Sequence, residues 1–237
     1  MTRVLVTRPE PGASRTAARL RELGFEPVVL PLSETHALPV ALETLPRAAA
    51  LLMTSANAVR HVPADVLRQL ADLPCHVVGP KTAAVAREAG LSVVETGSGD
   101  ARHLAERIAP SLAGRTVVYL CGRVRSLDFE EFLAEQGVKV LPIETYDTLP
   151  VDYPGKVVAT GLAGQPVEAA LLYSAKAAQA YSTLVQRPEL ARYFERTCVL
   201  ALSVRVAQAV SAVSPGRLAV ATRPDENALL ALLGTAE

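Results

Sequence analysis

An internal repeat constrains the fold of this chain more than any other feature of its sequence. In Leu51–Val59 an apolar run ends in two hydroxyls and an amide, and a helical pattern follows at once; Leu171–Gln179 repeats this arrangement. The other matching pairs are the segments around Gly24 and Gly137, His76–Ala86 and Leu200–Val210, and Thr96 and Thr222. The offset between the copies grows along the chain, which indicates that they differ by loop insertions.

Each copy consists of short apolar runs that alternate with helical patterns. The first run, Val4–Val6, precedes a predicted helix at Ala13–Leu23, whose apolar residues recur at helical spacing and which ends at Gly24. A series of such βα units favours parallel strands, right-handed crossovers and helices on both faces of a sheet. We therefore predict an α/β fold with two similar doubly wound parallel-sheet domains, flavodoxin-like in type, from a tandem duplication.

The remaining elements follow from the same patterns. The other predicted strands are Val28–Leu30, Ala49–Met53, His76–Val78, Ser92–Glu95, Val117–Leu120, Val138–Tyr146, Ala169–Tyr173, Cys198–Leu202 and Leu218–Ala221. The other predicted helices are Ala58–Leu70, Lys81–Ala89, Ala101–Ile108, Leu127–Glu135, Ala175–Val185, Val204–Val213 and Asp225–Leu233. We expect interruptions at Pro63 and Pro142, and a surface loop or linker at Pro150–Gly164.

The balance of charge argues against nucleic-acid and membrane partners. Lys plus Arg number 24, as do Asp plus Glu, and tryptophan is absent from the 237 residues. No run approaches the roughly 18 apolar residues of a membrane span, and the first run is too short for a signal peptide. We therefore expect a cytoplasmic protein with no nucleic-acid or membrane partner.

Sequence motifs for metals and common cofactors are missing. Cys75, Cys121 and Cys198 lie far apart and form no CxxC pair, which argues against a disulfide framework or a zinc site. The four histidines match no metal-ligand spacing, and the chain contains no complete dinucleotide, Walker A or nucleophile-elbow motif. We expect no metal and no cofactor.

Polar and basic residues gather where predicted strands give way to helices. The candidate binding residues are Arg8, Thr54, Ser55, Asn57, Gly79, Lys81, Thr82, Gly122, Arg123, Ser174, Lys176, Ser203 and Arg205, with Thr7, Arg125, Thr222 and Arg223 beside them. Each hydroxyl or amide alone is explained as a helix N-cap. The repeated cations are not, because a helix N-terminus disfavours positive charge by about a few tenths of a kcal/mol. They indicate a ligand with several carboxylates or phosphates; side chains that point into water are the alternative.

Tyr146 lies just after the last strand of the repeated unit, in the segment Glu144–Thr148. One interpretation is an amphipathic residue at a domain seam. The other is a proton donor, since a phenol with an unperturbed pKa of about 10 keeps its proton at neutral pH.

These residues together resemble the uroporphyrinogen-III synthase family over essentially the full chain. The resemblance is carried by Val4–Pro9, Leu23–Val28, Met53–Val59, Val78–Ala83, Val140–Thr148, the Ser174 corner and Arg223–Leu230. Each segment alone is weakly diagnostic, and their order and spacing make the set specific. One departure is Val206–Ala207, where the family often has Thr-Ala; Ser203 and Arg205 lie nearby.

The resemblance implies a two-domain arrangement in which the chain leaves one domain and returns to it. Residues 1–33 would join residues 149–237, and residues 34–148 would form the inserted domain. Two crossing strands, near Val28–Leu32 and Val140–Tyr146, would connect them, and the active-site cleft would lie between the domains.

The resemblance also implies a reaction. Hydroxymethylbilane, a linear tetrapyrrole with eight carboxylates, would lose its hydroxyl as water and close to uroporphyrinogen III with its terminal ring inverted, through a spiro intermediate. The enzyme would be a lyase, a monomer without cofactor, and could contact the upstream bilane-forming enzyme transiently. Tyr146 would act as general acid, and the corners, Ala175 included, would bind the acetates and propionates.

Two other interpretations fit the same sequence. A cytoplasmic two-domain binding protein could close on an anionic metabolite without catalysis, using the same duplicated halves. An inactive or regulatory relative of the synthase is the third. A turnover assay separates both from an enzyme, whereas ligand binding alone does not.

Overall fold

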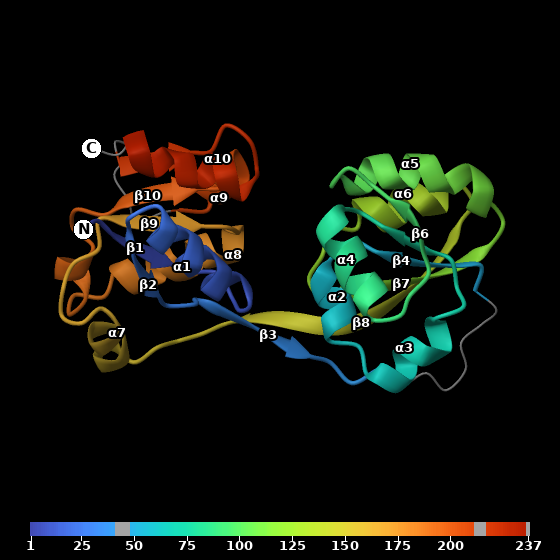
Figure 1. The fold of residues 1–237 in the computed structure, drawn as a ribbon, viewed down its shortest axis with the longest axis horizontal. Helices are drawn as coiled ribbons and strands as arrows, with labels where there is room; N and C mark the ends of the chain where they lie inside the picture. The colour runs from blue at the N-terminus through green and yellow to red at the C-terminus, as the bar shows by residue number, and fades with distance from the viewer. Residues whose placement is uncertain (41–47, 211–216, 236–237) are drawn as a thin grey trace. The chain divides into compact units, whose positions relative to one another are not determined.

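The chain folds into two compact units, each with its own sheet (Figure 1). The computed structural model describes residues 1–40, 48–210 and 217–235. Unit 1 comprises Met1–Thr35 and Leu149–Glu237, and unit 2 comprises His36–Thr148. The sequence prediction had its first boundary after residue 33 and its second after residue 148.

The sheet of unit 1 has the strand order β11-β10-β9-β1-β2, and all of its neighbouring strands are parallel. Its strands are β1 (Arg3–Val6), β2 (Glu26–Val29), β9 (Ala169–Leu172), β10 (Cys198–Ala201) and β11 (Leu218–Val220). Counted along the chain within this unit, the order is 2-1-3-4-5, that of a flavodoxin-like sheet. The strand order therefore reverses between β1 and β9.

The sheet of unit 2 repeats this order from a different starting strand. It runs β3-β8-β7-β4-β5-β6, with β3 (Ser33–Ala37), β4 (Ala50–Met53), β5 (Cys75–Val77), β6 (Val93–Thr96), β7 (Thr116–Gly122) and β8 (Lys139–Pro150). If the count begins at β7, the order from β8 to β6 is again 2-1-3-4-5. The equivalent reversal lies between β7 and β4, as the duplication in the sequence predicts.

Helices cover both faces of each sheet and enclose two apolar layers per unit (Figure 1). In unit 1 these are α1 (Gly12–Glu22), α7 (Gly155–Gly161), α8 (Ala175–Val185), α9 (Val204–Gln208) and α10 (Glu226–Ala231). In unit 2 they are α2 (Ala56–Arg60), α3 (Ala64–Leu70), α4 (Pro80–Glu88), α5 (Ala101–Leu112) and α6 (Asp128–Glu135). Short 3-10 helices occupy Ala191–Tyr193 and Leu232–Thr235. The doubly wound α/β prediction is confirmed.

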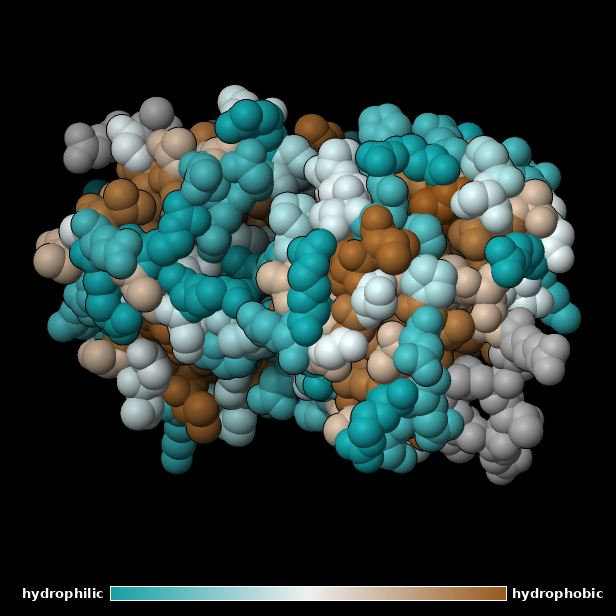
Figure 2. Space-filling view, turned by 45° about the vertical axis from the view of Figure 1, so that its right-hand side comes forward, coloured by the Kyte–Doolittle hydropathy of each residue, from teal (hydrophilic) through white to brown (hydrophobic). Residues whose placement is uncertain are grey.

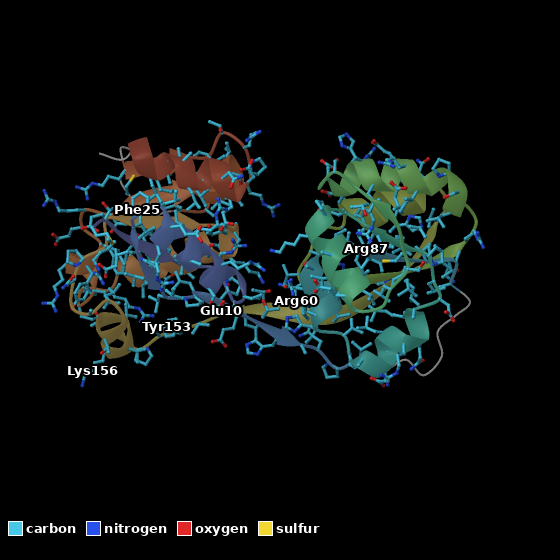
Figure 3. The ribbon with its side chains drawn as sticks, in the orientation of Figure 1. Glu10, Phe25, Arg60, Arg87, Tyr153 and Lys156 are labelled. Atoms are coloured by element: carbon cyan, nitrogen blue, oxygen red, sulfur yellow. The ribbon has the colours of Figure 1, made fainter. Side chains whose placement is uncertain are left out.

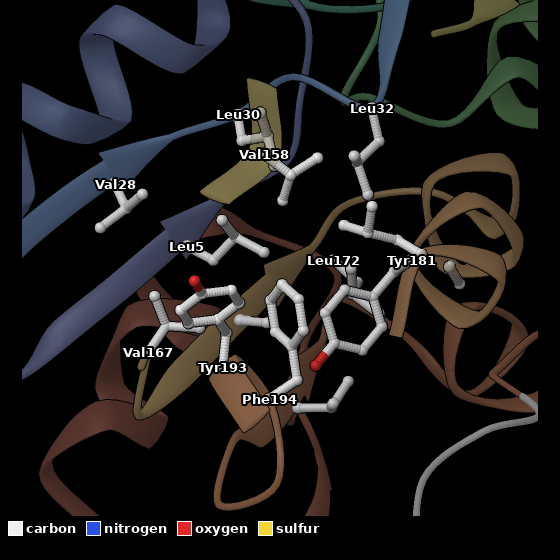
Figure 4. Packing of buried hydrophobic residues seen from close by; sticks show 14 of the residues in the cluster. Leu5, Val28, Leu30, Leu32, Val158, Val167, Leu172, Tyr181, Tyr193 and Phe194 are labelled. Atoms are coloured by element: carbon white, nitrogen blue, oxygen red, sulfur yellow. The ribbon is translucent and has the colours of Figure 1, made fainter. Parts of the chain in front are cut away.

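The apolar layer beneath α7 and α8 shows how one face is filled. Leu5 and Leu172 from the sheet are fully buried against Val158 of α7 and Tyr181 of α8 (Figure 4). The Tyr181 ring meets Phe194 edge-on, with 5.9 Å between centroids, a favoured aromatic geometry. This packing leaves the carboxyl ends of the strands as the edge where polar residues gather.

Two local predictions that rested on prolines and glycines were wrong. The segment Pro150–Gly164, expected to be a surface loop or linker, contains α7. Pro154 precedes this helix and Gly164, at φ +67°, follows it, so these residues mark helix ends. Strand β8 continues through Pro142, which stays in register with Tyr119; a strand accepts proline where no ladder bond from its N–H is required.

The first crossing strand is β3 rather than the predicted segment Val28–Leu32. Val28 and Val29 belong to β2 of unit 1, and Leu30–Leu32 belong to the connection after it, whereas β3 neighbours β8 in the other sheet. The predicted helix Val204–Val213 ends at Gln208, and residues 211–213 lie outside the described residues. Within the described part of the chain, no helix combines the length and apolarity needed to cross a bilayer.

Candidate functional site at the strand-order reversals

Each unit brings predicted site residues to the point where its strand order reverses. In unit 1, Arg8 follows β1 and Ser174 follows β9, and these strands are neighbours. In unit 2, Arg123 follows β7 and Thr54 follows β4, again neighbouring strands. Open α/β sheets bind ligands outside the carboxyl ends of strands at this reversal. The next strand in each sheet adds a further group: Gly79, Lys81 and Thr82 after β5, and Ser203 and Arg205 after β10.

The unit 1 corner is organised around the carboxylate of Glu226, at the start of α10. Its Oε1 accepts hydrogen bonds from Arg8 Nη1 at 3.0 Å, Thr16 Oγ1 at 2.5 Å and Tyr173 Oη at 2.9 Å. Arg19 Nη1 donates to its Oε2 at 3.0 Å. The Arg8 guanidinium also lies over the Tyr173 ring, 4.1 Å from its centroid. The predicted substrate-binding residue Arg8 is therefore already paired with a carboxylate of the protein, that of Glu226.

These contacts shift two pKa values in opposite directions. Burial alone would raise the pKa of Glu226, but hydrogen bonds from Thr16 and Tyr173 and the charge of Arg8 outweigh it, so the pKa is lowered. Burial raises the pKa of Tyr173 to about 12, and the nearby Glu226 carboxylate adds to that rise against the Thr16 hydrogen bond. The carboxylate therefore stays charged and the phenol stays protonated.

The predicted serines are helix N-caps. Ser55 accepts from Asn57 N at 3.2 Å, Ser174 from Ala177 N at 3.1 Å and Ser203 from Val206 N at 3.4 Å. Each cap satisfies an N–H group that has no partner within the helix. Ser174 remains exposed to solvent while doing so, and Ala175 and Lys176 begin α8 directly behind it.

At the unit 2 corner, Thr54 connects the end of β4 to the middle of β7. Its Oγ1 lies 2.7 Å from Tyr119 Oη, a hydrogen bond from the end of β4 to β7. Burial raises the pKa of Tyr119 to about 12, which the hydrogen bond to Thr54 opposes. Asn57 Oδ1 accepts from Arg60 at 3.2 Å, and Arg60 is an exposed residue at the end of α2 (Figure 3).

The cations after β7 have carboxylate partners. Arg123 pairs with Glu144 at 3.2 Å and lies 3.7 Å from Asp147 Oδ2. Arg125 binds Glu130 at 2.6 Å and Glu144 at 3.3 Å; the Glu130 hydrogen bond in particular raises the pKa of its guanidinium. Asp147 is buried, and its Oδ1 has no hydrogen-bond partner among the described residues.

Tyr146 lies over Gly122 at the end of β7. A Cβ atom added at Gly122 would be 2.7 Å from Tyr146 Cζ and 2.9 Å from its hydroxyl oxygen. The His61 ring lies 6.0 Å from the Tyr146 ring, centroid to centroid. Burial, with the charges of Arg60 and His36, lowers the pKa of His61, so that imidazole is neutral at pH 7. Tyr146 therefore has a neutral aromatic neighbour and a half-buried phenol.

Exposed apolar side chains accompany these polar corners. Val124 and Leu127, after β7, are 62% and 52% exposed, and Val204, after β10, is 62% exposed. Figure 2 shows hydrophobic residues interspersed among hydrophilic ones on one face of the molecule. Each corner thus has exposed apolar side chains beside its polar groups. Among the described residues, no group of three His, Cys, Asp or Glu side chains could hold a metal ion.

Several residues that shape the corners were not predicted as site residues. Glu226 was predicted only to lie in the helix Asp225–Leu233 and in the family segment Arg223–Leu230. Thr16, Tyr119, Thr145 and Tyr173 were not singled out. A signal existed for Tyr173, which directly precedes the Ser174 corner. None existed for Thr16, because its partner lies 210 residues away in the sequence.

Comparisons with known proteins agree on one family. The model of a family described as uroporphyrinogen-III synthase HemD matches residues 14–231. The porphyrin biosynthesis protein HemD of Ruminiclostridium josui is 31% identical over 162 residues, which are 62% of this chain. The match covers 32% of that relative, so the chain spans about a third of its length.

Two solved structures share the fold. Uroporphyrinogen-III synthetase from Helicobacter pylori aligns over 100% of both chains with a TM-score of 0.64 and 18% identity. A mutant uroporphyrinogen III synthase from Thermus thermophilus aligns over 100% of this chain and 98% of its own, with a TM-score of 0.57 and 21% identity. At these identities the likeness concerns the fold.

Proposed function

Because this chain belongs to the uroporphyrinogen-III synthase family, we propose that it cyclises hydroxymethylbilane to uroporphyrinogen III with loss of water. The observation that carries the proposal is the family match over residues 14–231. In this reaction the chain acts as a lyase of tetrapyrrole biosynthesis. Family membership does not favour the alternative of a binding protein without catalysis.

The chemistry of the two corners supports the choice of substrate. The bilane carries eight carboxylates on four apolar rings, and each corner combines hydroxyls, helix N–H groups and basic side chains with exposed apolar residues such as Val124 and Val204. We propose that substrate carboxylates bind at the corner residues named above. Arg8 would do so by exchanging or sharing its Glu226 partner.

The physical task is selection of one geometry. The free bilane closes without ring inversion, so the enzyme must hold the two chain ends in the orientation that leads to the inverted product, a proximity effect. The departing hydroxyl needs a proton to leave as water, and we assign that proton to the Tyr146 phenol. Ring closure returns a proton, so water is the only other product, and the proposal requires no cofactor.

The test is an isomer assay. Freshly prepared hydroxymethylbilane is incubated with the purified, metal-free protein, the products are oxidised, and the porphyrin isomers are separated. We expect predominantly the type III isomer. A product mixture equal to that of the protein-free control would contradict the proposal and favour the binding-protein alternative.

Location and assembly are part of the proposal. We place the reaction in the cytoplasm and expect a monomer, with at most a transient contact with the enzyme that delivers the bilane. Size-exclusion chromatography with light scattering should give a mass near 25.1 kDa. A stable dimer in that experiment would contradict the monomer.

A further inference from the structure

Strand β8 breaks the alternation expected of a β-strand. Leu141 and Ile143 pack against the apolar cluster beneath α2, α3 and α4, and Val140 packs on the opposite face. Since successive side chains point to opposite faces, Tyr146 should lie on the face of Val140. It packs instead against the same cluster as Leu141 and Ile143. The alternation of side chains between the two faces of the sheet is therefore reversed between Ile143 and Tyr146.

The cause is one extra residue in β8. Along the ladder with β7, Cys121 pairs with Glu144 and Gly122 pairs with Tyr146, and the register shifts between Cys121 and Gly122. Thr145 therefore has no partner across this ladder, which is a β-bulge. Bulges bend a strand and redirect the side chains that follow them, and they are frequent beside active sites.

The bulge is held by the Thr145 side chain. Thr145 is fully buried, and its Oγ1 donates to Ala58 O at 3.0 Å, with Cys121 O at 3.4 Å. This hydroxyl thus connects the bulge both to helix α2 and to Cys121, the last residue of β7 before the register shift. A second contact fixes the other side, because Arg123 N donates to Tyr146 O at 2.9 Å.

Space for the redirected ring comes from Gly122. A methyl group at this position would be 2.7–2.9 Å from three atoms of the Tyr146 phenol, the hydroxyl oxygen included. Contacts under 3.0 Å force a shift, and Tyr146 is the group that would have to move. Glycine is therefore required here for close packing of a ring rather than for an unusual backbone angle.

We propose that Thr145 and Gly122 are positioning residues that together orient the Tyr146 phenol. The bulge at Thr145 places the phenol on the face of the sheet that α2 covers, and Gly122 leaves room for the phenol hydroxyl. The consequence for catalysis rests on the proposed function of Tyr146 as general acid. The consequence for the ring itself does not.

The test measures the environment of the Tyr146 ring and the rate of the reaction in separate experiments. Protein labelled with 3-fluorotyrosine should give a ¹⁹F resonance for each of its six tyrosines, and Tyr146→Phe identifies the one from Tyr146. We expect Gly122→Ala and Thr145→Val to move this resonance and leave the other five in place. Thr145→Ser, which keeps the hydroxyl, should restore it. Gly161→Ala, where an added Cβ meets nothing within 4 Å, and Thr183→Val, on the surface of α8, are matched controls.

Turnover is measured on unlabelled protein. Gly122→Ala and Thr145→Val should lower kcat on the order of 10- to 100-fold with little change in KM, the effect of a misplaced catalytic group. In the Tyr146→Phe background, Gly122→Ala should lower kcat no further. Since Gly122→Ala could fold poorly, Thr145→Val and Thr145→Ser provide the same readout through a different contact.

The outcomes are distinguishable. An unmoved Tyr146 resonance in both variants overturns the proposal, as does an equal loss of kcat from Gly122→Ala with and without the Tyr146 hydroxyl. If the wild-type protein gave no type III isomer, the proposed function would fail, whereas the resonance would still decide whether Gly122 and Thr145 place the ring.

Discussion

Arg8 and Glu226, 218 residues apart in the sequence, form a 3.0 Å ion pair at the carboxyl edge of the unit 1 sheet. The same carboxylate accepts hydrogen bonds from Thr16 and Tyr173, and Arg19 binds its second oxygen. One acidic side chain thus connects the start of α10 to α1 and to the ends of β1 and β9. This side chain holds α10 in place, and it is paired with Arg8, the cation that a substrate carboxylate would approach.

This connection predicts a specific loss of stability in acid. The pKa of Glu226 is lowered by folding, so its contribution to the free energy of unfolding is complete above the unfolded value of about 4.3 and is lost as the pH falls through the lower folded value. We expect Glu226→Gln to destabilise the protein by about 1–3 kcal/mol at pH 7. The deficit should shrink as the pH approaches 3.

Urea unfolding between pH 7 and pH 3 measures this difference. The exposed Glu22, at the end of α1, provides a matched Glu→Gln control that should unfold like wild type. A Glu226→Gln deficit that stayed constant with pH would show that the loss comes from neutral hydrogen bonds rather than from the charge.

The second prediction concerns the stability contributed by Arg3, at the amino end of β1. It is 6% exposed, and its guanidinium donates to the carbonyl oxygens of Leu162, Gln165 and Pro166 at 2.8–2.9 Å and to Glu26 at 3.0 Å. Arg3→Met leaves these carbonyls without a donor and should cost about 2–4 kcal/mol. Arg3→Lys should recover only part, because an ammonium cannot reproduce the planar fork of a guanidinium.

Chemical denaturation of these variants, with turnover per folded molecule, is the measurement. Arg15→Met, at an exposed position of α1, is the matched control. Equal unfolding midpoints for Arg3→Met and Arg15→Met would contradict a role for the buried guanidinium. Turnover per folded molecule should stay near the wild-type value in both.

The succession of strands and helices along the chain and the polar corners could be predicted from the sequence, because both rest on local signals that the duplication repeats. Gly24 and Gly137, paired by the sequence repeat, end α1 and α6 at φ +83° and +77°, a conformation that glycine adopts readily. Ser55 and Ser174 likewise precede equivalent helices. A pattern that occurs twice at matching positions specifies the same βα unit twice.

The side-chain partners could not be predicted, for two physical reasons. Thr16 and Glu226 lie 210 residues apart in the sequence and come together through the tertiary fold, so no local pattern joins them. The bulge at Thr145 is a shift of one residue, and the apolar run around it reads as an ordinary strand. Helix α7 was missed because its prolines and glycines serve as end signals as well as loop signals.

Thr54 and Tyr119 allow a third prediction. The sequence predicts that Thr54 binds the substrate, whereas the structure shows that it forms a hydrogen bond with Tyr119. Their 2.7 Å hydrogen bond is partly buried, so Thr54→Val should destabilise the protein by about 1 kcal/mol, and Tyr119→Phe by a similar amount. The double variant should lose little more than either single one, since each removes the same bond.

Denaturation of the four proteins gives the coupling energy, and steady-state kinetics test substrate binding. If Thr54 also binds substrate, Thr54→Val should raise KM, and Tyr119→Phe should not. Additive losses of stability would show that the bond contributes nothing, and an unchanged KM for Thr54→Val would remove Thr54 from the binding residues.

Tyr146→Phe is the most direct test of the chemistry. The substitution removes only the hydroxyl and keeps the ring, which packs against its apolar cluster and faces His61. If the phenol supplies the proton that lets the hydroxyl leave as water, kcat should fall by about 10²–10⁴, the range for loss of a general acid. KM should change little, because the ring and the corner residues remain.

The measurement for Tyr146→Phe is the initial rate of type III formation after subtraction of the uncatalysed closure. Tyr193→Phe, which removes a phenol bound by Arg192 in unit 1, is the matched control and should retain wild-type kcat. An unchanged kcat for Tyr146→Phe would exclude Tyr146 as the proton donor and leave geometric selection by the corners as the source of catalysis.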